Sequence, residues 1–227
     1  MSKKIYTFWE GEMPGYIKLC LKTWKFDYVL LNYENVLAYT RFDLEKAKKF
    51  TLAQMSDIVR VHVLRDNGGI WMDADTIMIG DSLPKENMIG IPEERAAHCG
   101  YLNFEKNSHM MTMWAKDQDL KIEFGINTGW DLFANSFSDI YIKTHPRVAI
   151  CSRESMFPEL YNTGYGTAKE RYQSFYFTTN LGVDSLKPTE MLMLHNSWTP
   201  NWYKELSEEE TLNRMCTMSN ILREVVK

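Results

Sequence analysis

A chain of 227 residues is long enough to bury the core of one sizeable domain. Its 26 basic and 30 acidic residues give a formal net charge of -4, and this balance argues against nucleic acid as the main partner. The sequence has nothing close to the roughly 20 apolar residues that span a bilayer, so we expect at most peripheral contact with a membrane.

Short apolar runs alternate with helical patterns through the first third of the chain. Strands are predicted at 5–8, at 28–31 and in the run that ends at Asp73, and helices at 16–25, 43–49 and 52–67. Thr51 is a suitable N-cap for the last of these helices. Alternation of this kind predicts a mainly parallel sheet with helices on both faces. Ligands of such sheets bind beyond the carboxyl ends of the strands, where Trp9 and Asp73 fall.

The rest of the chain is less regular. Strands are predicted at 87–91, 98–104, 175–178 and 191–195, and helices at 108–116, 127–137 and 207–227. Ser207 can cap the last helix, and the three glutamates after it favour the helix dipole. We expect the apolar stripe of this helix to pack on the domain, with a membrane-surface or dimer role as the alternative. No internal repeat or linker is visible, so we expect one domain over 1–227 that closes with the helix 207–227.

The spacing of the cysteines indicates the cellular compartment in which the protein is expected. They are widely spaced and include no Cys-x-x-Cys pair: Cys20, Cys99, Cys151 and Cys216. Such spacing does not suggest a disulfide framework, and free thiols are typical of a reducing cytoplasm. Glu10 and Glu12 interrupt any apolar core of a signal peptide. We therefore expect a cytoplasmic protein, with the inner face of the cell membrane as the place of any peripheral contact.

Two carboxylates stand at the end of the strand that follows a pair of glycines. Asp73 and Asp75 are one residue apart, and residues i and i+2 of an extended segment point to the same side. Hard oxygen ligands suit Mg²⁺ or Mn²⁺. An Asp-x-Asp in a polar surface turn is a frequent accident, but Trp71 and Met72 are apolar right up to Asp73. The pattern therefore predicts a buried strand that delivers metal-binding carboxylates into a cleft.

An acid and a base lie on the predicted helix before this strand. Asp57 and Arg60 are three residues apart, so they are neighbours on one helical face, which continues through the apolar Val61 and Leu64. Such a pair can be no more than an internal salt bridge. Its position just before the strand that ends at Asp73 also allows it to hold a polar ligand.

Several segments of the chain together resemble one known family. They are Ile5 to Gly11, Ser56 to Arg60, Gly68 to Thr76 and Leu194 to Pro200. These segments resemble the capsular polysaccharide synthesis glycosyltransferases, which are relatives of glycosyltransferase family 32 and, more distantly, of the glucosylating clostridial toxin domains. The resemblance covers 5–84 and 192–202 well and the residues between them loosely. It implies an α/β fold of GT-A type, with a Rossmann-like, mixed and mostly parallel sheet flanked by helices.

The resemblance also implies a metal and diphosphate site. Asp73, Asp75 and His195 would hold a Mn²⁺ or Mg²⁺ ion, with His195 in the position of the family's C-terminal metal ligand. A single histidine after apolar residues is more often structural, and that alternative stays open for His195. Ser197 and Trp198, in the same segment, could contact the diphosphate of the donor and close over it.

The remaining site residues concern the sugar donor and the acceptor. By resemblance, Asp57 and Arg60 should hydrogen-bond ribose or sugar hydroxyls of the donor and belong to the catalytic machinery. Trp9 should line the nucleotide pocket, although it can equally be a core aromatic. Asn103 and Asp131 are further catalytic candidates on the donor or acceptor side, in the part of the chain where the resemblance is loose.

These residues predict a metal-dependent glycosyltransferase. We expect it to move a sugar from a nucleoside-diphosphate donor, most simply a UDP-sugar, onto a lipid-linked oligosaccharide or another capsular or surface glycan. A divalent ion stabilises the diphosphate leaving group in such a reaction. Family membership implies retention of the anomeric configuration.

Two other functions are weighed against this one. A sugar nucleotidyltransferase normally has a glycine-rich basic loop after its first strand, whereas residues 9–12 are acidic and poor for cradling phosphates. A carbohydrate-binding protein without catalytic activity is disfavoured because Asp73, Asp75, Arg60 and His195 are all present.

Overall fold

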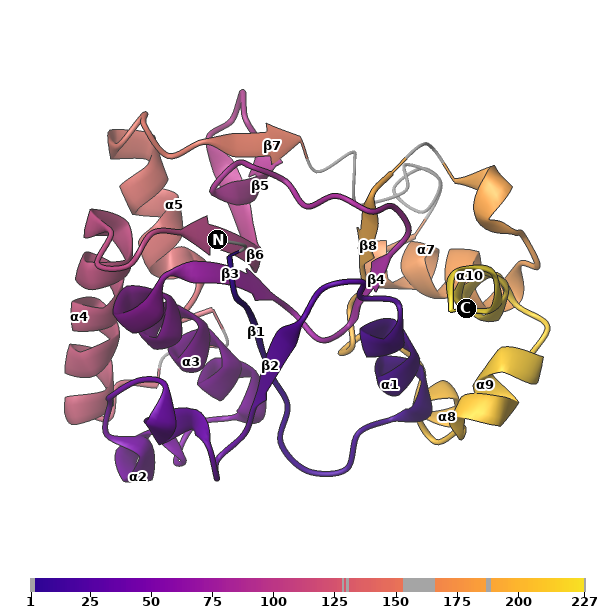
Figure 1. The fold of residues 1–227 in the computed structure, drawn as a ribbon, viewed down its shortest axis with the longest axis horizontal. Helices are drawn as coiled ribbons and strands as arrows, with labels where there is room; N and C mark the ends of the chain where they lie inside the picture. The colour runs from indigo at the N-terminus through magenta and orange to yellow at the C-terminus, as the bar shows by residue number, and fades with distance from the viewer. Residues whose placement is uncertain (1–2, 128, 130, 153–165, 187–188, 227) are drawn as a thin grey trace. The chain divides into compact units, whose positions relative to one another are not determined.

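The computed structural model describes residues 3–127, 129, 131–152, 166–186 and 189–226 (Figure 1). The chain divides into two compact units. Unit 1 consists of Met1–Glu10, Asp27–Asp73 and Pro84–Ser152, and unit 2 of Gly11–Phe26, Ala74–Leu83 and Arg153–Lys227. No helix among the described residues is both long enough and apolar enough to cross a membrane.

A six-stranded sheet forms the centre of unit 1, with the order β2-β1-β3-β6-β5-β7 among the described residues. Its strands are β1 (Ile5–Phe8), β2 (Tyr28–Leu31), β3 (Gly69–Met72), β5 (Met88–Ile91), β6 (Ala96–Phe104) and β7 (Ile150–Ser152). Strands β2, β1 and β3 are parallel, β6 is antiparallel to both β3 and β5, and β7 is parallel to β5. Five strands therefore run one way and β6 runs the other, which confirms the predicted mixed, mostly parallel sheet.

The helices of unit 1 cover this sheet. They are the 3-10 turn Val36–Ala38, α2 (Leu44–Ala47), α3 (Leu52–Asn67), α4 (His109–Glu123) and α5 (Asn135–Thr144). Helix α3 packs on β1 and β3, α4 packs on α3, and α5 packs on β6 (Figure 1). Ile58 and Val59 of α3, Trp71 of β3 and Trp114 of α4 are fully buried in one apolar core. The expected α/β class is confirmed.

Helix α3 has both of the ends that its sequence predicts. The Thr51 side chain accepts a hydrogen bond from the backbone N–H of Gln54, and the Gln54 side chain accepts one from the backbone N–H of Thr51. At the other end Gly68 has φ of +68°, which an L side chain adopts only with strain. These two signals place the helix so that its carboxyl end leads directly into β3.

The described residues of unit 2 are mainly helical. Its helices are α1 (Gly15–Lys22), α7 (Ala168–Gln173), the π-helical turn Ser174–Thr178, the 3-10 turn Val183–Ser185, α8 (Asn201–Lys204), α9 (Glu208–Asn213) and α10 (Thr217–Val225). Strands β4 (Thr76–Met78) and β8 (Met191–Met193) form an antiparallel pair. Helix α1 packs on β4, α8 and α9. A Cβ at Gly15 would lie 2.5 Å from the carbonyl oxygen of Leu206, so only glycine permits this close approach.

The predicted strand at 175–178 is wrong. Residues Ser174–Thr178 instead continue α7 as a π-helical turn. Phe175, Tyr176 and Phe177 are all buried, at 7%, 0% and 9% exposure. A strand would alternate these rings between two faces, whereas the helical turn lets all three pack into unit 2. Packing therefore overrides the β-propensity of three consecutive aromatic residues.

The single helix expected over 207–227 is also wrong, because the chain forms α9 and α10 with a break between them. Arg214 and Cys216 have extended backbone angles, with ψ of 140° and 162°. The Arg223 side chain donates to the carbonyl oxygens of Leu212 and Arg214, which the break leaves without helical partners. The N–H of Thr217 donates to the carbonyl oxygen of Thr179. These contacts compensate for the interrupted helix. Of the expected stripe, Met218 and Leu222 are buried, but Met215 is 80% exposed.

The helix predicted over 127–137 lies further along the chain, and positions 128 and 130 fall outside the described residues. Helix α4 extends past the expected 116 to Glu123, and α5 begins only at Asn135. The Gln54 amide donates to the Asn127 side chain at 3.2 Å and to the carbonyl oxygen of Gly129 at 2.9 Å. Asn127 and Gly129 are therefore held against the start of α3, and Asp131 precedes the helix instead of lying inside it.

Candidate functional site

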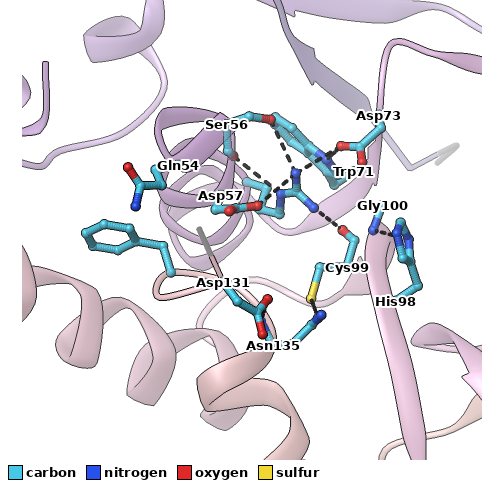
Figure 2. Close-up of polar contacts among 12 residues, drawn as sticks. Gln54, Ser56, Asp57, Trp71, Asp73, His98, Cys99, Gly100, Asp131 and Asn135 are labelled. Carbon is cyan, nitrogen blue, oxygen red and sulfur yellow. Dashed lines mark hydrogen bonds and ion pairs between the residues drawn. The ribbon is translucent and has the colours of Figure 1, made fainter. Parts of the chain in front are cut away.

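A buried guanidinium joins α3 to the end of β3 in unit 1. Arg60 Nη2 lies 3.0 Å from Asp57 Oδ1 and 3.1 Å from Asp73 Oδ1, and Nη1 donates to the carbonyl oxygen of Cys99 at 2.6 Å. Figure 2 shows the Asp57 and Asp73 side chains and the Cys99 backbone around this group. The guanidinium also lies over the Trp71 ring, 5.4 Å from its centroid. The sequence prediction that Asp57 and Arg60 share a helical face is confirmed.

The first carboxylate of the Asp-x-Asp pair has a fixed orientation. The indole Nε1 of Trp71 donates to Asp73 Oδ1 at 2.8 Å, and the N–H of Asp73 donates to the carbonyl oxygen of Gly100 at 2.9 Å. The antiparallel register of β3 with β6 makes this second contact possible, because Met72 pairs with Tyr101. The side chain of Asp73 is 24% exposed, so it remains accessible at the end of its strand.

Asp57 carries the most perturbed carboxyl group of this cluster. Burial raises the pKa of Asp57 to about 7, because the charged form loses its hydration. The Arg60 guanidinium opposes this shift, and the charges of Asp73 and Asp131 add to it. One cation is shared between two carboxylates and cannot neutralise both. The site therefore offers carboxyl oxygens as acceptors, which suits hydroxyl groups of a ligand.

We expect the pH dependence of stability to change in the variant Asp57→Asn. The folded-state pKa of about 7 lies above the ordinary value of 3.8, so between them the folded protein holds a proton that the unfolded chain has released. The contribution of Asp57 to stability is then complete below the lower value and is lost as the pH rises through about 7. Because asparagine does not ionise, Asp57→Asn should gain stability relative to wild type as the pH rises from 3.8 to about 7, and the difference should stay constant above that range.

Thermal melting of both proteins across this pH range measures the effect. The variant Asp27→Asn is a matched control, because Asp27 is an exposed aspartate of the same unit. If the difference in melting temperature between wild type and Asp57→Asn stays constant with pH, the pKa of Asp57 is not raised.

Asp131 and two residues that the sequence did not single out lie beside this cluster (Figure 2). Asp131 Oδ1 accepts a hydrogen bond from the N–H of Asn135 at 3.3 Å, and the Cys99 thiol donates to Asn135 Oδ1 at 3.1 Å. Burial is the main cause of the raised pKa of Asp131, and Asp139 adds to it. Cys99 and Asn135 fall where the family resemblance is loose, and neither stands in a motif that could have indicated it.

Two predicted site residues of unit 1, Asn103 and Trp9, make contacts outside the Asp57–Arg60–Asp73 cluster. The buried Asn103 amide accepts a hydrogen bond from Lys3 Nζ at 2.8 Å and donates to the carbonyl oxygens of Pro84 and Lys85 at 3.4 and 3.3 Å. These contacts hold the segment before β5, and the catalytic role of Asn103 stays a prediction. Trp9 follows β1 and is half-buried, and its backbone N–H donates to the carbonyl oxygen of Leu31 at 2.9 Å.

The second carboxylate, Asp75, belongs to unit 2. The N–H of Leu194 donates to the carbonyl oxygen of Asp75 at 3.1 Å, which extends the pairing of β4 with β8 by one step. The N–H of Asn196 donates to Asp75 Oδ2 at 2.8 Å. The Asp75 side chain is thus tied to the segment that carries His195.

A tight turn after β8 presents His195, Ser197 and Trp198 together. The N–H groups of Trp198 and Thr199 both donate to the carbonyl oxygen of His195, at 2.9 and 3.0 Å. The rings of His195 and Trp198 lie 4.0 Å apart with an angle of 38° between their planes. Ser197 is exposed and His195 half-buried. The turn brings three of the predicted ligand-binding residues into one short segment.

The donor atoms of unit 2 fit a divalent cation by their chemistry. A carboxylate suits Mn²⁺ and Mg²⁺, whereas an imidazole suits transition-metal ions. Asp75 and the segment that carries His195 are hydrogen-bonded to each other. Over the part of the chain that the structure describes, no group of three His, Cys, Asp or Glu side chains is gathered as a metal site. A Mg²⁺-type ion is commonly held by one or two carboxylates and completed by substrate phosphates and water.

The fold and the two polar clusters define an α/β protein with polar side chains beyond strand ends. Residues 1–148 of the 227 match the family described as "Capsular polysaccharide synthesis protein". The chain belongs to the capsular polysaccharide synthesis protein family, as its motifs predicted. No match to a curated protein was found.

Two solved structures show remote similarity to the chain. One is the PaToxG glycosyltransferase, with a TM-score of 0.44 and 18% identity, over 64% of this chain and 70% of that chain. The other is the apo-form glycosyltransferase GlyE of Streptococcus pneumoniae TIGR4, with a TM-score of 0.45 and 14% identity, over 94% of this chain and 62% of that chain.

Proposed function

We propose that this member of the capsular polysaccharide synthesis family is a glycosyltransferase of GT-A type that uses a nucleoside-diphosphate sugar. The observation that supports it most is the Asp57–Arg60–Asp73 cluster at the carboxyl end of β3. Ligands of α/β sheets bind at such strand ends. Family membership supports a role in glycan synthesis, and both solved structures described above carry the name glycosyltransferase.

In this proposal the unit 1 cluster binds the sugar or ribose of the donor. Arg60 has five N–H donors in a rigid plane, which match the oxygens of neighbouring hydroxyl groups. Asp57 and Asp73 accept hydrogen bonds from the same kind of group. Asp131 lies within electrostatic reach of Asp57 and is a further candidate on the donor or acceptor side. Trp9, which follows β1, is proposed to line the nucleotide pocket, and Asn103 stays a catalytic candidate.

The diphosphate is proposed to bind with a Mn²⁺ or Mg²⁺ ion. Asp75 and His195 would hold the ion. Asp73 is proposed as a third ligand because it belongs to the Asp-x-Asp sequence. When bound, the ion acts as a Lewis acid that stabilises the departing diphosphate. Ser197 and Trp198 lie in the same turn as His195 and are proposed to contact the diphosphate and exclude water from it.

The finer assignment follows the family resemblance of the sequence. We propose a UDP-sugar as donor, retention of the anomeric configuration, and a lipid-linked oligosaccharide or other capsular glycan as acceptor. The reaction would take place in the cytoplasm, with any membrane contact peripheral and at the inner face.

A donor screen tests the proposed activity. The protein is incubated with Mn²⁺ and each of the common UDP- and GDP-sugars, and the released nucleoside diphosphate and pyrophosphate are measured separately. We expect one UDP-sugar to release UDP without pyrophosphate, and we expect EDTA to abolish the release. Release of pyrophosphate would instead show a nucleotidyltransferase. Binding of a sugar with no release from any donor would support a carbohydrate-binding protein.

A further inference from the structure

One buried phenol in unit 2 contacts both ends of the turn that carries His195. Tyr172 of α7 is fully buried, and its hydroxyl oxygen accepts a hydrogen bond from the N–H of His195 at 3.3 Å. The same oxygen lies 3.3 Å from Thr199 Oγ1. The Tyr172 ring stands edge-on to His195 and to Trp198, at centroid distances of 5.6 and 5.8 Å. Tyr172 therefore contacts the backbone of the turn and two of its side chains.

The proton positions in this contact follow from the partners. The Thr199 hydroxyl donates to the carbonyl oxygen of His195 at 3.2 Å, so its oxygen is left to accept from Tyr172. The phenol of Tyr172 is a hydroxyl donor as well as an acceptor. Tyr172 thus accepts from His195 and donates to Thr199, which sets the direction of both hydrogen bonds.

A second buried phenol reaches Asp75 through one residue of the same turn. Tyr16 of α1 is also fully buried, and its hydroxyl donates to the side-chain oxygen of Asn196. The backbone N–H of Asn196 donates in turn to Asp75 Oδ2 at 2.8 Å. Tyr16 and Tyr172 therefore approach the Asp75 and His195 positions from two different helices.

We propose that Tyr172 and Tyr16 are positioning residues that hold His195 and Asp75 in the orientation that a divalent cation requires. The inference rests on the proposed function, in which these two side chains are metal ligands. Partners of metal ligands commonly change metal affinity by 10- to 100-fold when they are replaced, because they orient the ligand. Neither tyrosine touches the ion in this proposal, and each acts through a neighbouring residue.

The variants Tyr172→Phe and Tyr16→Phe test the inference, with Tyr203→Phe as a matched control. Tyr203 is a third fully buried tyrosine of unit 2, and its hydroxyl pairs with Ser219 Oγ at 3.0 Å instead of with the turn. Each change removes one buried hydroxyl and keeps the ring. Mn²⁺ affinity is measured in the presence of UDP from the electron paramagnetic resonance signal of free Mn²⁺, and thermal melting is followed in parallel.

We expect Tyr172→Phe and Tyr16→Phe to bind Mn²⁺ about 10- to 100-fold more weakly than wild type. Tyr203→Phe should keep the wild-type affinity, even where its melting temperature falls as far as theirs. Equal affinity in all four proteins would overturn the positioning role, and so would a uniform loss in all three variants. Absence of Mn²⁺ binding by wild type would instead remove the proposed metal site itself. Should one tyrosine variant fail to fold, the other decides the outcome.

Discussion

The variant Asp75→Asn should lose metal-dependent sugar transfer by on the order of 100-fold or more. A bound metal ion contributes several kcal/mol of charge stabilisation, and each 1.36 kcal/mol is tenfold in rate. Asparagine has nearly the same size and can still accept the hydrogen bond from the N–H of Asn196. The fold should therefore persist while the negative charge is removed. The initial rate of UDP release at increasing Mn²⁺ concentration measures the loss.

A second aspartate of unit 2 supplies the control for this variant. Asp81 pairs with Lys25, and its side chain is 79% exposed. Asp81→Asn removes the same charge from the same unit and should leave both the rate and the Mn²⁺ dependence unchanged. Wild-type turnover in Asp75→Asn, at every Mn²⁺ concentration, would show that Asp75 is not a ligand.

Arg60→Gln should destabilise the protein by about 3–5 kcal/mol, because it leaves the buried Asp57 and the partly exposed Asp73 without their cation. Asp57 and Asp73 both lie within 3.1 Å of the guanidinium that this change removes. The double variant Asp57→Asn with Arg60→Gln should recover much of this loss, since one of the two carboxylates is then neutral as well. Urea unfolding of wild type, the single variant and the double variant measures the three free energies.

Activity of the same variants separates recognition from packing. If Arg60 binds the donor, the double variant stays inactive after its stability returns, and Arg60→Lys also loses activity because an ammonium cannot reproduce the planar group. In that case UDP-sugar with Mn²⁺ should raise the melting temperature of wild type more than that of Arg60→Lys. Wild-type activity in the double variant would reduce the pair to an internal salt bridge.

The part of the fold that the sequence predicted best is the part with strong local signals. Helix α3 begins after Thr51 and ends before Gly68, as expected, because a side-chain cap and a glycine act within a few residues of each end. The end of β3 just before Asp73 followed from the apolar run that forms the strand. Helix α3 carries Asp57 and Arg60, and Asp73 directly follows β3, so this part of the site could be predicted as well.

The elements that were missed depend on distant partners. Strands β4 and β7 have three residues each. Strand β4 is a strand because it pairs with β8, more than a hundred residues later. The break between α9 and α10 depends on the side chain of Arg223 reaching back to Leu212 and Arg214. No window of local sequence contains these contacts.

The same limit applies to the site. The carbonyl oxygen of Cys99 faces Arg60 only because β6 lies beside β3, and a carbonyl group leaves no mark in the sequence. Tyr172 lies in a stretch whose aromatic residues suggested a strand nearby, whereas the contact with His195 requires the helix that actually forms. Contacts of this kind, between residues far apart in the sequence, are therefore visible only once the packing is known.

The way in which the two units share the chain restricts how the protein can be cut. The chain passes from one unit to the other after residues 10, 26, 73, 83 and 152, so no single cleavage separates them. A fragment that stops at residue 148, where the family match ends, would keep α1 and β4 but lose α8, α9 and β8, which pack against them. Such a fragment would expose apolar surface and would be prone to aggregate. Truncation is thus a poor route to an isolated unit, and point variants in the whole chain are the better experimental tool.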